Sequence, residues 1–204
     1  MDMNRPMYGI ISHWDLDHYR VLLNMTSSQI NMIQSLLVPS KMPNTLSVKN
    51  TLNLLGTHKV PIEVLGPAFK TGRYIELVSL GMKNGIEVYR STDGKNINQS
   101  GIALCVNGKK STGVLTGDHH YRQLNNSVFS SCAEQQYTMV VPHHGGQAGV
   151  FKEDYWNSIN FKGGAISTKS GRYRNLPRDN IHKFFRNKSF HCTNCTKSDY
   201  WTNL

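Results

Sequence analysis

The chain lacks long apolar stretches and has few cysteines and few acidic residues. No apolar run approaches the roughly 20 residues needed to cross a bilayer, so no membrane-spanning segment is expected. The first six residues, Met-Asp-Met-Asn-Arg-Pro, lack the apolar core of a secretion signal, which favours a cytoplasmic location for this chain. Repeats, low-complexity tracts and a clear linker are also missing, and 204 residues suit one domain over 1–204.

Cysteine is scarce, with four residues, Cys105, Cys132, Cys192 and Cys195. Only the last two have a motif-like spacing, Cys-x-x-Cys, directly after His191. Such a pair can be half of a zinc site or a redox pair, but no second cysteine pair is present to complete a four-thiolate site. We therefore interpret both cysteines as ordinary small residues of a terminal strand.

Acidic residues are also scarce, with 13 against 23 Lys and Arg, which gives a net charge of +10. Residues 162–197 carry much of this excess: one acid, Asp179, and nine bases, namely Lys162, Lys169, Arg172, Arg174, Arg178, Lys183, Arg186, Lys188 and Lys197. Aromatic residues are interleaved there, and a basic surface with aromatic rings suits binding to a phosphate backbone. The alternative is a solvated surface whose charge only aids solubility. The segment favours a polyanionic partner such as nucleic acid.

Potential metal ligands are concentrated in residues 12–18, which follow the apolar run 7–11. This segment places His13, Asp15, Asp17 and His18 within six residues. Mixed imidazole and carboxylate ligation suits Zn²⁺, Mn²⁺ or Fe. The alternative for this segment alone is a polar turn after a strand, with its charges solvated.

Two later segments have the same form, an apolar strand that ends in potential ligands and glycines. Residues 113–118 end at Asp118, and residues 139–146 contain His143 and His144 before two glycines. Glycine lets the backbone approach an ion closely. Three strand-end clusters in one chain predict a metal site.

Residue patterns also predict the helices and strands. Apolar spacing after Thr26 favours a helix over 29–37, and the other helices are expected over 48–57, 121–130, 151–157 and from Pro177 to residue 185. Strands are expected over 7–12, 61–65, 74–80, 86–90, 102–106, 112–115, 140–141, 165–167 and 190–192.

Taken together, these segments resemble the metallo-β-lactamase fold superfamily and are most similar to hydrolase domains related to the C-terminal part of the competence protein ComEC. The resemblance covers roughly residues 7–195. Its motifs are Ser-His-x-Asp-x-Asp-His at 12–18, Asn-x-Ser at 98–100, Leu-x-Gly-Asp at 115–118 and Pro-His-His-Gly at 142–145. It implies an α/β (α+β) fold, a four-layer αββα sandwich.

The resemblance also implies a centre of two divalent metal ions, Zn or Mn. His13 and Asp15 would hold one ion, Asp17 and His18 the other, and Asp118 would bridge the two. One of the paired histidines would complete the second ion's ligands. We favour His144 as this ligand and His143 as a general acid or substrate contact, so that Asp17 and His143 are the expected catalytic residues.

The chain departs from the family pattern in the ligands of the first ion and in the length of the segment before the first motif. No histidine directly precedes the Gly117-Asp118 strand, and Asp15 stands where many relatives have histidine, which would leave the first ion weakly held or favour Mn²⁺. Relatives usually have a strand-rich stretch before the first motif, whereas eleven residues precede Ser12. We therefore expect an N-terminally partial domain, or a first sheet completed by a missing segment or another protein.

The expected function is metal-dependent hydrolysis of a phosphodiester, with nucleic acid as the leading substrate. Four basic residues are the expected substrate contacts, namely Lys169, Arg172, Arg174 and Arg178. Two alternatives stay open: hydrolysis of a small phosphoester, or a catalytically silent truncated domain that binds nucleic acid or a partner protein.

Overall fold

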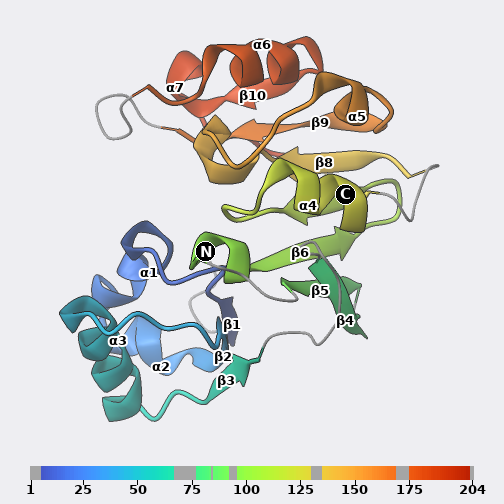
Figure 1. Ribbon diagram of the computed structural model, residues 1–204. Coiled ribbons are helices and arrows are strands. Elements are labelled where there is room, and N and C mark those ends of the chain that lie inside the picture. The colour runs from blue at the N-terminus through green and yellow to red at the C-terminus, as the bar shows by residue number, and fades with distance from the viewer. Residues whose placement is uncertain are drawn as a thin grey trace.

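A computed structural model describes residues 6–66, 77–83, 85–91, 96–129, 135–168 and 175–202. The chain forms two β-sheets, each accompanied by helices (Figure 1). Three of the expected substrate contacts, Lys169, Arg172 and Arg174, lie outside the described residues.

The smaller sheet has the strand order β1-β2-β3 and is parallel throughout. Its strands are β1 (Met7–Ile10), β2 (Ile33–Pro39) and β3 (Ile62–Leu65), and its helices are α1 (Leu16–Leu23), α2 (Ser27–Asn31) and α3 (Leu46–Thr57). Buried side chains from β2 and all three helices form one hydrophobic core. The core explains why apolar residues recur at helical spacing in α3.

The helix expected over 29–37 is wrong in its second half, because that half is strand β2. A helix does form after Thr26, but it begins at Ser27, with the Thr26 side chain as its cap. Ile33, Leu36 and Val38 are buried in β2, which lies between β1 and β3. A short apolar run in a fully buried strand cannot be distinguished from a helix by its spacing alone.

The larger sheet has seven strands in the order β10-β9-β8-β7-β6-β5-β4. Its strands are β4 (Leu77–Lys83), β5 (Ile86–Ser91), β6 (Ile102–Asn107), β7 (Thr112–Leu115), β8 (Tyr137–Val140), β9 (Phe161–Ile166) and β10 (Phe190–Cys192). Strands β4 to β7 pair antiparallel, whereas β7 to β10 pair parallel. Parallel neighbours require crossover connections, and α4 (Tyr121–Ser127), α5 (Glu153–Asn157) and α6 (Asp179–Asn187) provide them.

Short turns complete the described elements: η1 (Asn98–Ser100), η2 (Pro142–Gly145) and α7 (Thr193–Thr196). Helix α6 corrects one expectation, because it begins at Asp179 with Arg178 as its N-cap, so Pro177 lies before the helix instead of at its first position. The helix expected over 121–130 ends at Ser127.

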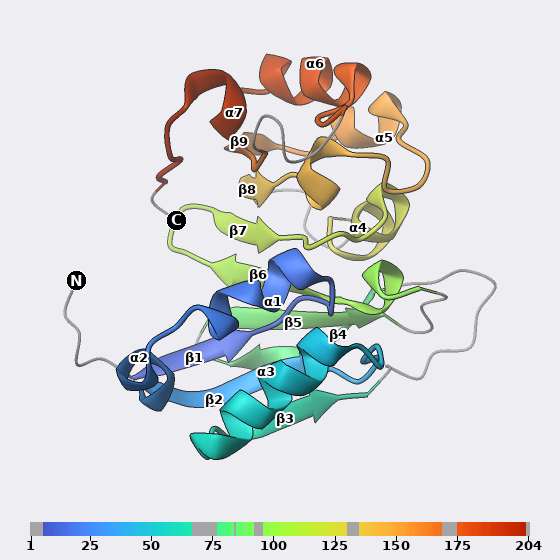
Figure 2. The ribbon, with the colours of Figure 1, turned by 90° about the vertical axis from the view of Figure 1, so that its left-hand side faces the viewer.

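A second hydrophobic core lies between the larger sheet and helices α4 to α6, with Trp156, Tyr121 and Phe185 fully buried. Figure 2 shows the small sheet and α1 to α3 in front of the β4–β6 part of the larger sheet. The expected α/β fold of two sheets with helices is therefore confirmed. Within the described ranges, no helix has the length and apolarity to span a bilayer.

Candidate metal centre

The centre lies where several parallel strands end. The segment 12–18 follows β1, residues 116–118 follow β7, residues 141–144 follow β8, and Ser167 follows β9. In sheets of this kind, ligands bind outside the carboxyl ends of the strands. A cavity of about 300 Å³ opens at this edge, and its lining includes His18, Asp118, His143 and His144.

A backbone contact brings the first sheet onto the second at this point. The amide of Ile102 donates a hydrogen bond to the carbonyl of Ser12 at 2.7 Å. A Cβ on Gly101 would lie 2.8 Å from the same carbonyl oxygen, so only glycine permits this approach. Gly117 has a φ of +53°, and a Cβ there would lie 3.2 Å from the Ser12 Cβ. The two glycines therefore allow residues 12–18 to lie over the end of β7.

Asp118 is the central acid of the cluster. Its Oδ2 lies 3.4 Å from His13 Nε2 and its Oδ1 lies 3.6 Å from His18 Nε2. The same carboxylate accepts a hydrogen bond from His143 Nδ1 at 2.7 Å and one from Asn98 Nδ2 at 3.4 Å. A buried carboxylate thus faces three imidazole rings.

The surroundings keep Asp118 ionised although it is buried. Burial alone would raise the pKa of its carboxyl, but the contacts with His13 and His143 and the nearby His18 outweigh burial and hold that pKa well below its usual range. The hydrogen bond with Asp118 raises the pKa of His143, whereas burial and the neighbouring His13 lower the pKa of His18. Neutral imidazole beside ionised carboxylate is the protonation state that binds a metal ion.

A second group of ligand atoms comes from Asp17, His18 and His144. The Asp17 carboxylate lies 3.3 Å from His144 Nε2 and 3.9 Å from His18 Nε2. His144 Nδ1 lies 2.6 Å from the carbonyl oxygen of Ser167. A carbonyl only accepts hydrogen bonds, so Nδ1 carries the proton and Nε2 presents its lone pair to the cluster.

Ser12 orients the other two rings. Its hydroxyl lies 3.2 Å from His13 Nδ1 and 3.0 Å from His18 Nδ1. A hydroxyl has one proton to donate, so at least one of these rings must donate its own Nδ1 proton to the serine oxygen. That ring then directs the lone pair of its Nε2 towards Asp118.

The donor set fits divalent ions. His13 Nε2 is fully buried and has no hydrogen-bond partner among the described residues, although Asp15 Oδ2 lies 3.5 Å away. Two donors on one Zn²⁺, each at about 2.0–2.2 Å, lie about 3–3.5 Å apart, close to the separations in this cluster. The Asp15 carboxylate makes no capping hydrogen bond to α1, although it occupies the N-cap position.

The paired histidines have an unusual backbone. His143 has a φ of +51° and His144 a φ of +55°, and Gly145 continues the left-handed run at +76°. A non-glycine residue in this region costs on the order of 1 kcal/mol, and such strain is concentrated at functional sites. Hydrogen bonds from His143 N to the Gly117 carbonyl and from Arg178 N to the Gly145 carbonyl hold the turn.

The structure therefore brings the expected ligands together: His13, Asp15, Asp17, His18, Asp118 and His144. His143 lies beside Asp118, and its side chain is 34% exposed towards the cavity. Arg178 is exposed and is joined to the histidine turn through its backbone.

Sequence reasoning missed three neighbours of these ligands. It gave Ser12 and Asn98 no role beyond motif membership, because the Ser12 contacts depend on how the segment 12–18 folds and the Asn98 contact joins two segments 20 residues apart. His119, which follows Asp118 in the chain, is fully buried, and burial lowers its pKa to about 3 and keeps its ring neutral. Its ring lies 3.4 Å from the position of a Cβ on Gly101.

No family model and no curated protein matches the chain. Among solved structures, the chain is similar to Tm1679, a metal-dependent hydrolase of the β-lactamase superfamily, at 11% sequence identity and a TM-score of 0.44. That match covers 91% of this chain and 75% of the other. At this identity and TM-score the likeness says nothing about catalysis, which has to be inferred from the chain's own side chains.

Proposed function

We propose that the chain is a metal-dependent hydrolase that cleaves phosphodiester bonds in nucleic acid. The observation that carries this proposal is the position of Asp118, whose carboxylate lies within 3.6 Å of imidazole nitrogens from both ends of the segment 12–18. A buried, ionised acid between two sets of imidazole and carboxylate donors suits a pair of divalent ions.

The proposed ligands divide into two sets that share Asp118. His13 and Asp15 would hold the first ion, and the second would be held by Asp17, His18 and His144. When bound, divalent ions supply Lewis-acid activation of water and neutralise charge on a phosphoryl group. The buried His13 Nε2 and the partly exposed Asp15 Oδ2 lie 3.5 Å apart, which supports this pair as ligands of the first ion.

His143 is the proposed proton donor or substrate contact. Its Nδ1 is bonded to Asp118, and the rest of its ring borders the cavity. This leaves Nε2 available to a substrate oxygen, whereas both nitrogens of His144 already face Ser167 and Asp17. The different contacts of the two rings support His144 as the ligand and His143 as the reacting side chain.

Charge supports a polyanionic substrate. The chain carries a net charge of +10, and the exposed Arg178 is attached to the turn that carries both histidines. Lys and Arg near a cleft bind phosphate and release condensed counterions. Nucleic acid is therefore favoured over a small neutral ester.

The test is hydrolysis by purified protein supplied with Mn²⁺ or Zn²⁺, with DNA, RNA and a model phosphodiester as substrates. We expect cleavage that Asp118→Ala abolishes, because that change removes the donor common to both ligand sets. Asp154→Ala is the matched control, since Asp154 is an exposed aspartate on α5. Activity that survives Asp118→Ala would refute the proposed site. Activity confined to the model ester and insensitive to salt would point to a small phosphoester.

A further inference from the structure

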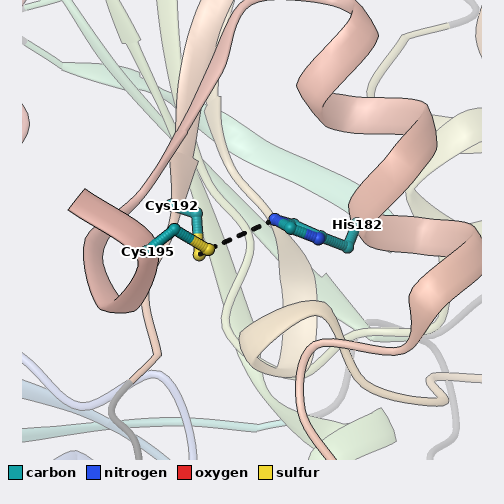
Figure 3. A group of neighbouring side chains, drawn as sticks. All are labelled: His182, Cys192 and Cys195. Carbon is teal, nitrogen blue, oxygen red and sulfur yellow. Dashed lines mark hydrogen bonds between the residues drawn. The ribbon is translucent and has the colours of Figure 1, made fainter.

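A second group of metal-ligating side chains lies at the C-terminal edge of the larger sheet. His182 comes from α6, Cys192 from the end of β10 and Cys195 from α7 (Figure 3). One ligand atom from each lies within 4.8 Å of the others. His182 Nε2 lies 3.4 Å from Cys195 Sγ, and the two sulfur atoms are 2.7 Å apart.

We propose that His182, Cys192 and Cys195 form a zinc site, separate from the candidate metal centre. The sequence pattern Cys-x-x-Cys offers two thiolates, and the fold adds an imidazole from ten residues upstream of the first cysteine. Two thiolates and one imidazole are a donor set that zinc prefers over Mg²⁺ or Mn²⁺.

The distances agree with tetrahedral ligation. With Zn–S near 2.3 Å and Zn–N near 2.0–2.1 Å, the sulfur and nitrogen of a tetrahedral site lie about 3.6 Å apart. The His182–Cys195 distance of 3.4 Å is close to this value. The two sulfurs would have to separate by about 1 Å to share an ion. Cys195 is exposed, so its side chain has room to make that adjustment.

The neighbouring histidine is not part of the group. His191 directly precedes Cys192, but its Nε2 donates to the Ser198 carbonyl oxygen at 2.9 Å and lies 2.8 Å from Thr196 Oγ1. The ring that faces the sulfurs belongs to α6. A simple redox pair needs only the two sulfurs, so the convergence of the His182 ring favours a metal over a disulfide.

The proposed site has three protein ligands and one position open to solvent. Cys192 is fully buried, whereas Cys195 lies at the surface, so water can supply the fourth ligand. Binding would release the two thiol protons to solvent. The ion would join α6 to the edge strand β10, and the N-cap of α6, Arg178, donates its backbone amide to the Gly145 carbonyl of the histidine turn.

Cobalt is a suitable probe, because Co²⁺ bound by thiolate absorbs strongly in the near ultraviolet. Metal-free, reduced full-length protein would be titrated with Co²⁺ and then with Zn²⁺. We expect one equivalent of sulfur-bound Co²⁺, displaced by Zn²⁺. Cys195→Ser should at least halve the thiolate absorption per bound Co²⁺, since it removes one of the two thiolates, and His182→Asn should weaken Co²⁺ binding at least tenfold. Both changed residues are at least partly exposed, so folding should survive and circular dichroism would verify it.

The matched controls are Cys105→Ala, which removes a buried thiol outside the group, and His191→Asn, which removes the neighbouring imidazole. Both should keep the absorption. Asp118→Ala should keep it too, so failure of the zinc site and failure of the candidate metal centre are distinguishable. The proposal is overturned if reduced protein gives no thiolate absorption, if the absorption is undiminished in Cys195→Ser, or if the cysteines are recovered only as a disulfide without metal.

Discussion

The contacts of single side chains determine which residues of the candidate metal centre bind metal and which take part in the reaction. The Ser167 carbonyl fixes the tautomer of His144, whereas Asp118 engages His143. We predict that His144→Ala lowers the number of Mn²⁺ or Zn²⁺ ions retained per chain, while His143→Ala keeps the ions and lowers turnover. Metal analysis after dialysis, combined with kcat, measures both effects. Equal metal loss in the two variants would contradict the assignment.

Arg90 is a second residue with a large expected effect. It is fully buried, its guanidinium donates to the Gly101 carbonyl at 3.0 Å, and burial lowers its pKa to about 10, so it stays charged at neutral pH. Arg90→Ala removes this donor and leaves a cavity, which should lower the free energy of unfolding by about 3 kcal/mol. Urea denaturation measures the change. Arg20→Ala, at an exposed position of α1, should stay within about 0.5 kcal/mol of the parent.

The arrangement of the centre could be predicted from the sequence only in part. His13, Asp118 and His144 could be selected because each follows an apolar strand, and parallel strands end at one edge of a sheet. The Ser167 carbonyl and the buried His119 could not, because backbone orientation and burial depend on packing between segments far apart in the chain. His182 was missed for the same reason, as it lies ten residues before Cys192 on another element.

At the scale of elements, residue patterns predicted helices and strands reliably where the structure of a segment depends on its own residues. Strands β6 and β7 and helix α3 formed within two residues of the ranges that the residue patterns indicated. Strand β2 was misread as helix because its neighbours β1 and β3, and not its own sequence, make it extended. The beginning of α6 was misplaced by two residues, since Arg178 instead of Pro177 adjoins the helix.

The packing of β8, β9 and β10 depends on Gly164. A Cβ at this position would collide with the carbonyl oxygen of Met139 and with the ring of Phe190. Gly164→Ala should therefore destabilise the protein by about 2 kcal/mol or more, and it should weaken metal retention by displacing Ser167 at the end of β9. Thermal denaturation and metal analysis measure these effects.

The matched control, Gly56→Ala, should change the free energy of unfolding in the opposite direction. Gly56 lies inside α3, and a Cβ there would meet no atom within 4 Å. Gly56→Ala should raise the free energy of unfolding by about 0.5–1 kcal/mol, because alanine loses less backbone entropy in a helix. A destabilised Gly56→Ala variant would show that the packing around α3 differs from that described here.

At the scale of the whole molecule, metal binding should contribute to stability. Ions that bind the folded chain and not the unfolded one stabilise it by about 2.7 kcal/mol at 100 times their dissociation constant. We predict that a chelator lowers the melting temperature of the parent protein, that Asp118→Ala removes the part of this effect due to the candidate metal centre, and that Cys195→Ser removes the part due to the proposed zinc site. Calorimetry with and without chelator tests it. An unchanged melting temperature would argue against tight ion binding at neutral pH.

The net charge of +10 gives a second prediction at this scale. If nucleic acid is bound through phosphate contacts, its affinity should fall steeply with salt, and Arg178→Ala should reduce the slope of log K against log salt by about 1. Fluorescence anisotropy with labelled DNA or RNA measures the slope. Lys49→Ala, at an exposed position of α3, is the control and should leave the slope unchanged.

The left-handed backbone of His143 and His144 affects the rate at which metal ions bind to the candidate metal centre. The folding of the surrounding sheet already holds this unfavourable conformation, so an arriving cation meets an imidazole that needs little reorganisation. The rate of metal binding should then be limited by diffusion of the cation to the site and by loss of its bound water. Under stopped-flow mixing, the observed rate should rise in proportion to ion concentration without levelling off.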